Sequence, residues 1–382
     1  MSNRIVKYVG FYDVYKENYK RVSSLAAVNK MNYLISVFNK LGYKIEIISP
    51  SWIRDNTIKK EKIHRKYNIE DNVIVFPPSF ITKNKLTRGI KIIYSLCWLT
   101  FYLLFNTEKK QKIIVYHSPW LYLPLMILKF IKKPHVVLEV EEIYQDVSNI
   151  GRIQTKWETK LLNLGDSYIF SNDLMHKKIG KNKNSIVLYG VYEIFPVLTH
   201  KYHDGKIHLL YAGILDNIKN GAHNAIEAAK FLSDKYVLHI IGFGQNKASI
   251  ISEILEHNKI YACKIRFDGA KTGDEFVEYC QRCDIGLSTQ TTKGEYVNTS
   301  FPSKILTYLG LGLEVVSGNL ECVTQSLIAN HLVIYHNDDP NDIAKAIMNV
   351  PILERVSSNN ILYKLEMKLV KDLEEIMEGE NE

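Results

Sequence analysis

A chain of 382 residues with 46% hydrophobic and 24% charged residues excludes a disordered or fibrous protein, and it exceeds what one core usually supports, so we expect two globular domains. The formal net charge of +8 is uneven: residues 1–200 hold 31 Lys+Arg and 16 Asp+Glu (+15), and residues 201–382 hold 18 and 25 (−7). The basic half indicates an anionic partner, and nucleic acid or an anionic membrane would both satisfy it.

The first half of the chain alternates short apolar runs with helical patterns. This rhythm predicts a parallel sheet with helices on both faces. In chain order, the expected strands are Ile5–Phe11, Tyr43–Ile48, Val73–Phe76, Ile113–Tyr116, His135–Val140, Ser167–Phe170 and Ile186–Leu188. The expected helices are Leu25–Leu41 (ended by Gly42), Arg88–Phe105, Leu121–Phe130 and Thr155–Leu164.

Two apolar runs in this half, Ile92–Phe105 and Trp120–Ile131, are flanked by lysines. The first has 14 residues, fewer than the roughly 20 that a membrane-spanning helix needs. One interpretation is a pair of buried core helices. The alternative is a pair that docks on a membrane surface, helped by the basic half.

The same rhythm restarts after a polar segment, Pro196–Lys206, which we interpret as a linker. The expected elements are strand Ile207–Ala212, helix Ala222–Leu232, strand Val237–Ile241, helix Asn246–His257, strand Ile265–Asp268, helix Asp274–Cys280, strand Ile285–Ser288, a helix from Ser303 and strand Glu314–Ser317. We therefore predict an α/β protein with two Rossmann-like domains facing a cleft: residues 1–200, residues 201–355, and a helical tail at 356–382 that could pack back on the first domain.

The five cysteines are an odd number, and the first strand-like run begins at Ile5, so we expect no secretory signal and a reduced, cytosolic setting. The sequon at Asn298 is then expected to stay unglycosylated. Cys280 and Cys283 have the spacing of half a zinc site, but no second pair accompanies them, so we interpret them as packing residues and expect no metal.

The most informative stretch is residues 297–317, where a polar loop leads into the helix at Ser303. Free backbone N–H groups and the positive end of the helix dipole favour an anion there, and Lys304 would add a full charge. A diphosphate fits this site, although an ordinary capped helix is the simpler interpretation. The loop Gly213–Gly221, with Lys219, offers a second phosphate-friendly helix start.

Three further motifs lie at strand ends. Gly242-Phe243-Gly244 follows a strand, but the spacing of a nicotinamide fingerprint is not completed, and a tight turn near a ligand is the better interpretation. His117 ends a strand, where it could donate to a substrate oxygen. Glu139 and Glu141 occupy alternate positions and so share a side, where acceptor hydroxyls would suit them.

Taken together, these segments resemble the retaining glycosyltransferases of the GT-B fold known as family four. The resemblance covers nearly the whole chain. It rests on Tyr211-Ala212-Gly213, Lys219-Asn220-Gly221, His239–Gly244, Phe267-Asp268-Gly269, Cys283–Ser288 and Phe301–Leu309 in the second half, and on Tyr116–Pro119 and Leu138–Tyr144 in the first, which look like acceptor-side strand ends of capsule and O-antigen enzymes.

The resemblance implies a role for each matched residue. His117 and Lys304 would be catalytic. The donor would be held by Gly213, Lys219, Gly242, Gly244, Asp268, Gly269, Thr299, Ser300, Pro302, Ser303, Ile305 and Thr307, and the acceptor by Tyr12, Glu139, Glu141 and Glu142. The family usually has two glutamates where this chain has Thr299 and Thr307, which weakens the expected ribose contact.

The sequence therefore predicts a metal-independent transfer of a hexose-type sugar from a nucleoside diphosphate, expected to be UDP, to a lipid-linked glycan in surface polysaccharide synthesis. We expect a cytoplasmic protein, peripheral at the inner face of the cell membrane, with no cofactor and no nucleic-acid partner. Two alternatives stay open: a nucleotide-sugar epimerase or hydrolase of the same fold, and a non-catalytic partner of another transferase.

Overall fold

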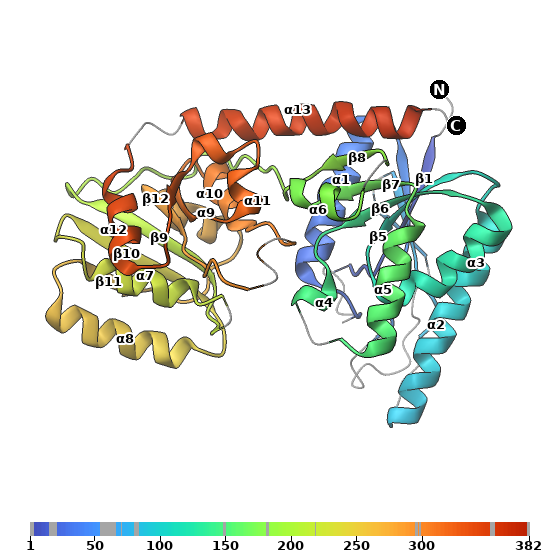
Figure 1. The fold of residues 1–382 in the computed structure, drawn as a ribbon, viewed down its shortest axis with the longest axis horizontal. Helices are drawn as coiled ribbons and strands as arrows, with labels where there is room; N and C mark the ends of the chain where they lie inside the picture. Colours follow the sequence, from blue (N-terminus) through green and yellow to red (C-terminus); the bar gives the residue numbers. More distant parts are fainter. Residues whose placement is uncertain are drawn as a thin grey trace. The chain divides into compact units, whose positions relative to one another are not determined.

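The computed structural model describes residues 4–14, 21–53, 66–69, 71–79, 84–147, 150–180, 183–217, 219–294, 297, 299–351 and 356–379. The chain divides into two compact units (Figure 1). Unit 1 comprises residues 1–171, 175–188 and 369–382, and unit 2 comprises residues 172–174 and 189–368. The main division falls at Leu188, earlier than the expected boundary at residue 200, because the segment taken as a linker bonds to unit 2: the amide of Leu198 donates to Gln281 Oε1 at 2.9 Å.

Unit 1 is built on an eight-stranded sheet in the order β3-β4-β2-β1-β5-β6-β7-β8. All neighbouring strands are parallel except β3 on β4. The strands are β1 (Ile5–Val9), β2 (Lys44–Ile48), β3 (Lys66–Ile69), β4 (Asn72–Val75), β5 (Lys112–Tyr116), β6 (His135–Val140), β7 (Ser167–Phe170) and β8 (Ser185–Val187). The central strands are mostly apolar because both faces of a parallel sheet are covered, and Glu139 in β6 is a buried exception.

The helices of this part of the chain are α1 (Leu25–Lys40), α2 (Lys85–Asn106), the 3₁₀ turn η1 (Pro119–Leu121), α3 (Tyr122–Lys132), α4 (Tyr144–Val147), α5 (Arg152–Leu164) and α6 (Asp173–Lys178). Helix α2 begins before the predicted Arg88 because Asn84 and Thr87 form a reciprocal capping box. Among the described residues, α2 is the one helix long and apolar enough to cross a membrane by length and composition alone.

The expectation that the first apolar run is a buried core helix is wrong for most of α2. Its buried residues are Lys91, Ser95, Leu99 and Leu103, which recur every fourth position and form one stripe. Leu99 and Leu103 join the core of unit 1, while the apolar residues on the opposite face are exposed. The sequence did not reveal this because α2 is apolar on both faces.

Unit 2 is built on a six-stranded, fully parallel sheet in the order β11-β10-β9-β12-β13-β14. Its strands are β9 (Ile207–Ile214), β10 (Tyr236–Phe243), β11 (Lys264–Phe267), β12 (Ile285–Ser288), β13 (Glu314–Gly318) and β14 (Val333–Tyr335). Its helices are α7 (Gly221–Ala229), α8 (Lys247–Ile260), α9 (Gly273–Gln281), α10 (Lys304–Gly310), α11 (Glu321–Thr324), the turn η3 (Ala329–His331) and α12 (Pro340–Met348). Strand order reverses between β9 and β12, and such a switch point is where open α/β sheets bind ligands.

The last helix, α13 (Val356–Glu378), begins in unit 2 and ends in unit 1. Its final turn bonds to unit 1: Lys112 Nζ donates to the carbonyls of Ile376 and Met377 at 3.0 Å, and Arg4 pairs with Glu378 at 2.7 Å. A lysine that donates to the last carbonyls stabilises a helix end. The last part of α13 therefore belongs to unit 1.

The two sheets, one fully parallel and one parallel except for β3, confirm the predicted α/β class. The elements that the sequence did not predict are β3, β14, α4, α6, α11 and α12. Most are short, but α12 carried a readable signal: Asp339 caps it by accepting from the amides of Asn341 and Asp342, and Pro340 occupies the first helical position.

Candidate functional site: a lysine pocket at the strand ends of unit 2

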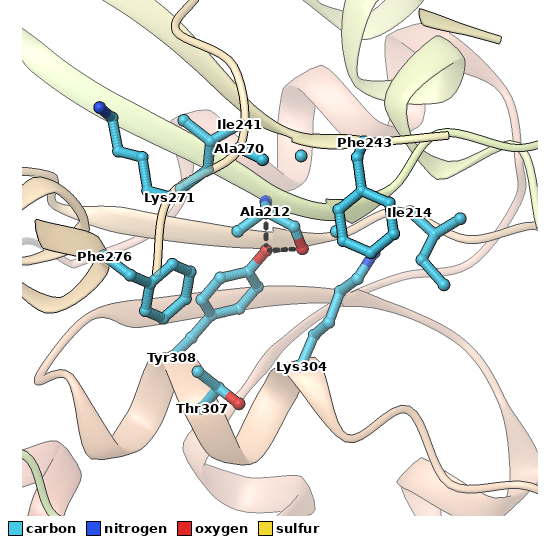
Figure 2. A pocket seen from close by; sticks show the side chains of 12 residues that line it. Ala212, Ile214, Ile241, Phe243, Ala270, Lys271, Phe276, Lys304, Thr307 and Tyr308 are labelled. Atoms are coloured by element: carbon cyan, nitrogen blue, oxygen red, sulfur yellow. Dashed lines mark hydrogen bonds between the residues drawn. The ribbon is translucent and has the colours of Figure 1, made fainter. Parts of the chain in front are cut away.

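A pocket of about 270 Å³ lies at the carboxyl ends of β9 and β10 (Figure 2). Its lining residues come from four segments of unit 2: Ala212, Gly213, Ile214, Ile241, Gly242, Phe243, Ala270, Lys271, Phe276, Lys304, Thr307 and Tyr308. Of the predicted donor residues, Gly213, Gly242 and Thr307 line it, together with Lys304, which the sequence analysis named as catalytic. A mostly apolar pocket with a few polar groups is typical of a small-molecule site.

Lys304 is the first residue of α10, and its side chain runs from the helix toward the end of β9 (Figure 2). Its Nζ donates to the hydroxyl of Tyr211 at 2.9 Å and lies 4.1 Å from the centre of that ring. A Cβ at Gly213 would stand 2.3 Å from the same Nζ, so only glycine leaves room for the lysine. Gly213 and Lys304, which the sequence named separately as site residues, are therefore in direct packing contact.

The charge of Lys304 differs from the expected full charge. Burial, helped by the nearby charge of Lys219 and opposed by Asp216, lowers the pKa of Lys304 to about 7. Near neutral pH a part of the molecules would therefore carry an uncharged Lys304 when the pocket is empty. An anion placed beside this ammonium would restore the charge.

The start of α10 corrects one part of the predicted anion site. Ser303 is helical at the N-cap position, and its side chain makes no capping bond. The Ile305 amide donates to the Pro302 carbonyl at 3.0 Å, and the Ile305 side chain is buried. The amide of Ile305 is therefore engaged, and Lys304 is the group of this turn that reaches into the pocket.

The Gly-Phe-Gly motif ends β10 and packs against the end of β9. A Cβ at Gly242 would lie 1.9 Å from the Gly213 carbonyl oxygen, and one at Gly244 would lie 2.2 Å from that of Leu215. The amide of Gly242 donates to the carbonyl of Gly269 at 2.9 Å. The absence of side chains at these glycines thus permits close backbone packing at the pocket wall. The sequence had predicted a tight turn near a ligand at this motif.

The two threonines at the usual glutamate positions differ in exposure. Thr299 is buried, and its hydroxyl has no hydrogen-bond partner among the described residues. Thr307 lines the pocket, and its hydroxyl donates to the Ser303 carbonyl at 3.4 Å. Thr307 is therefore the better placed of the two for a ligand hydroxyl. Ser300, which we also predicted for the donor, is half-buried in the preceding loop and does not line the pocket.

Two further predicted donor residues stand outside the pocket lining. Lys219 is exposed in the loop after β9, and its amide donates to Asp216 Oδ1 at 2.6 Å. Asp268 is exposed after β11 and accepts a hydrogen bond from the hydroxyl of Tyr279. Lys271 lines the pocket but was not among the predicted site residues. It lies two positions after the motif Phe267-Asp268-Gly269, and its ammonium pairs with Glu275 at 2.7 Å.

The predicted residues of unit 1 lie at the ends of β1, β5 and β6. His117 is buried, its ring stacks on Tyr144 with centres 5.3 Å apart, and its Nε2 lies 3.4 Å from Glu158 Oε1. Burial lowers the pKa of His117 to about 4, so the imidazole is neutral at physiological pH. The catalytic role of His117 stays a prediction, and the structure shows a tightly packed imidazole that contacts Tyr144 and Glu158.

Glu139 and Glu141 share a side, as predicted, and they meet a lysine that the sequence analysis did not name. Lys30 on α1 pairs with Glu141, and its charge lowers the pKa of the buried Glu139, although burial raises that pKa more strongly. Glu139 also accepts from the hydroxyl of Tyr8. Burial lowers the pKa of Lys30 to about 8.

The other two predicted acceptor residues lie nearby in unit 1. Glu142 is half-buried two positions after β6. Tyr12 is buried in the loop after β1, and its hydroxyl donates to Asn32 Oδ1 at 2.5 Å. Both acceptor roles stay predictions.

Solved structures share this architecture over almost the entire chain. The E. coli trehalose-6-phosphate synthase bound with UDP-2-fluoro glucose aligns with a TM-score of 0.64, 11% identity and 99% coverage of both chains. The lipopolysaccharide outer core galactosyltransferase WaaB aligns at 0.59, with 12% identity over 98% of this chain and 96% of its own. The pneumococcal O-GlcNAc transferase GtfA, in complex with UDP and GlcNAc, aligns at 0.61, with 12% identity and 99% coverage of both. The fold is GT-B.

No protein-family model matches the chain, and no curated protein matches its sequence. At 10–12% identity the solved structures establish the GT-B fold and leave the chemistry to be argued from the residues.

A series of four hydrogen bonds, which we call the hydrogen-bond chain, ends at Asp268, two residues before the pocket-lining Ala270. Its four links are Asp204 to His208 Nε2 at 3.0 Å, His208 Nδ1 to His239 Nε2 at 2.8 Å, His239 Nδ1 to the Tyr279 hydroxyl at 2.8 Å, and that hydroxyl to Asp268. Both histidines are buried, and the ring of Tyr202 stacks on both. Burial, aided by the neighbouring His208 and Arg266, lowers the pKa of His239 to about 4.

The cysteine pair next to Tyr279 is part of the core of unit 2. Cys280 and Cys283 are buried, and burial raises the pKa of the Cys280 thiol to about 12. Within the described residues, no cluster of three or more His, Cys, Asp and Glu could hold a metal ion. The complete burial of both side chains shows that the pair packs in the core of unit 2.

Proposed function

We propose that this protein is a retaining glycosyltransferase that moves a hexose-type sugar from a nucleoside diphosphate, with UDP as the expected nucleotide, onto a lipid-linked glycan. The observation that carries the proposal is the placement of Lys304. Lys304 lies in a pocket at the strand ends of a GT-B domain, and a partly desolvated ammonium there would attract a diphosphate.

The chemistry follows from that position. As the bond between the sugar and the diphosphate breaks, negative charge grows on the leaving phosphate oxygens. Lys304 would stabilise that charge, and Lys219 would add a second positive charge from the loop after β9. Thr307 would offer a hydroxyl to the donor. Retention of configuration and independence from metal are implied by the family resemblance.

Two solved structures of this fold support the choice of nucleotide, since one holds UDP-2-fluoro glucose and another holds UDP with GlcNAc. The acceptor is proposed from unit 1, whose carboxylates at the end of β6 would accept hydrogen bonds from sugar hydroxyls. A lipid-linked acceptor would place the protein at the cytoplasmic face of the cell membrane.

The test is a melting-temperature screen with UDP, GDP, ADP and their sugar conjugates. A ligand held at about 100 times its dissociation constant stabilises the folded state by about 2.7 kcal/mol, which corresponds to a rise of roughly 5–10 °C. We expect UDP-sugars to give that rise. Gly213→Ala should abolish it, because the added Cβ would displace Lys304.

The matched control is Lys271→Ala, which changes a lysine of the same pocket whose ammonium pairs with Glu275 and should keep the rise. If none of the nucleotide sugars shifts the melting temperature of the wild type, the donor assignment is wrong and a non-catalytic partner is favoured. Isomerised sugar, or sugar released without acceptor, would instead favour an epimerase or hydrolase.

A further inference from the structure

Unit 1 exposes an apolar surface made by α2 and α3, which pack against each other (Figure 1). On α2, the exposed apolar residues recur at helical spacing along the face opposite the buried stripe. We call these residues and their counterparts on α3 the α2–α3 face: Leu86, Ile90, Ile93, Phe101 and Phe105 on α2, and Leu123, Met126, Ile127, Phe130 and Ile131 on α3.

The exposure of the α2–α3 face is unusual for its residue types. Phe105 is 83% exposed, Phe130 is 86% exposed and Leu86 is 74% exposed. Scattered single apolar residues are normal on a protein surface, whereas ten on two adjacent helices form a patch of the kind that meets a partner or a membrane.

The charges around the α2–α3 face indicate which kind of partner it would bind. Neither α2 nor α3 contains an acidic residue. Lysines stand at the ends of both helices and in the loops that follow: Lys85, Lys109, Lys110, Lys132 and Lys133. Lysine is depleted from interfaces between protein copies but is attracted to anionic lipid headgroups, so this combination favours a bilayer over a second copy of the chain.

The geometry also decides how the face would meet the bilayer. Lys91 lies on the inner face of α2 and donates to the carbonyl of Ile53 at 2.8 Å, while Leu99 and Leu103 are part of the unit 1 core. A spanning helix would have to withdraw these residues from the core. Helix α2 can therefore present one face only, as helices lying in the membrane interface do.

We propose that the α2–α3 face docks unit 1 onto an anionic lipid bilayer, with Phe105 and Phe130 inserted at the boundary between headgroups and acyl chains and the flanking lysines among the headgroups. This inference rests on the proposed function for the lipid-linked acceptor that such a bilayer would hold. Its test requires neither donor nor acceptor.

The experiment is cosedimentation of the full chain with vesicles of phosphatidylcholine alone or with about 30% phosphatidylglycerol. We expect binding to the anionic vesicles that weakens steeply with added salt, and little binding to the neutral ones. Phe105→Ser combined with Phe130→Ser should weaken binding by at least 10-fold. The matched control is Leu255→Ser with Ile260→Ser, two exposed apolar residues of α8 in unit 2, which should bind like the wild type.

A second double variant tests the charges without disturbing the backbone. Lys110 and Lys133 adopt positive φ angles of 60° and 52°, a conformation that asparagine tolerates. Each lysine near an anionic surface contributes about a 5-fold gain in affinity, so Lys110→Asn with Lys133→Asn should weaken binding roughly 30-fold.

Two results would overturn the inference: equal vesicle binding by the wild type and the Phe105/Phe130 variant, or a wild-type dimer in solution that this variant loses while no vesicle binding occurs. The second result would assign the face to a second copy of the chain. Vesicle binding by a protein that transfers no sugar would retain the inference and overturn the proposed function.

Discussion

Lys30 in unit 1 and Lys304 in unit 2 are both lysines whose pKa burial lowers, and both lie beside the carboxyl ends of parallel strands, yet their partners differ. Lys30 pairs with Glu141 and donates to the Leu188 carbonyl at 2.9 Å. Lys304 meets the hydroxyl and ring of Tyr211, and within the described residues it forms no ion pair with a carboxylate. The first ammonium is neutralised by the protein, while the second is available to an anion from solution.

The largest effect that this comparison predicts is on stability at Lys30. Lys30→Met removes the partner of a mostly buried carboxylate and should cost about 3–5 kcal/mol of unfolding free energy. Denaturant unfolding measures it. Lys30→Met with Glu141→Gln should recover part of the loss, and a single variant as stable as the wild type would show that Lys30 is not a structural counter-ion.

The next effect is on catalysis at Lys304. Lys304→Ala should lower turnover of a UDP-sugar by roughly 10²-fold, because one charge contact to the transition state is lost. Lys271→Ala, the control from the same pocket, should stay within a few-fold of the wild type. Unchanged turnover in Lys304→Ala would remove the diphosphate assignment.

A smaller effect is on stability at Lys304, where removing the ammonium should stabilise the protein, whereas removing that of Lys30 should destabilise it. The pKa of Lys304 is about 7 in the folded protein and 10.5 as its ordinary value, so the folded state binds fewer protons between these pH values, and the penalty of burying the charge is fully present below pH 7. Lys304→Met should therefore stabilise the protein by ~1–2 kcal/mol at pH 6, and the gain should vanish as the pH rises toward 10. Denaturant unfolding at pH 6 and pH 9.5 measures it, and an equal gain at both values would contradict this origin.

The smallest effect is the number of protons that the protein takes up when UDP binds. At pH 8 most of the Lys304 side chains are uncharged in the empty pocket, and a bound diphosphate would raise their pKa. Binding of UDP should take up somewhat less than one proton per nucleotide. Calorimetry in buffers of different ionisation enthalpy measures the uptake, with Lys304→Met as the control that should take up none at this site.

The sequence predicted the parallel sheets because most of their strands are apolar runs, and it named Lys304 and Gly213 as site residues because each lies in a recognisable motif. It missed Lys30, since a lysine inside the helical pattern of α1 looks like a solvated side chain until the fold brings Glu141 beside it. It also could not foresee that Ile305 would use its amide within its own turn. Contacts between residues far apart in the chain could not be predicted from the sequence, because only the folded structure shows which residues meet.

The hydrogen-bond chain from Asp204 to Asp268 has a consequence for the direction of its own bonds. Its four links need four hydrogens, whereas two imidazole rings with one N–H each and one tyrosine hydroxyl carry three. With Tyr279 donating to Asp268, His239 must donate to Tyr279 and His208 to His239, which leaves a bare His208 Nε2 facing the carboxylate of Asp204.

That unmatched contact lies at the solvent end of the hydrogen-bond chain, since the side chain of Asp204 is 50% exposed. In this arrangement every donor of the hydrogen-bond chain points toward Asp268, which lies just before the pocket-lining residues Ala270 and Lys271.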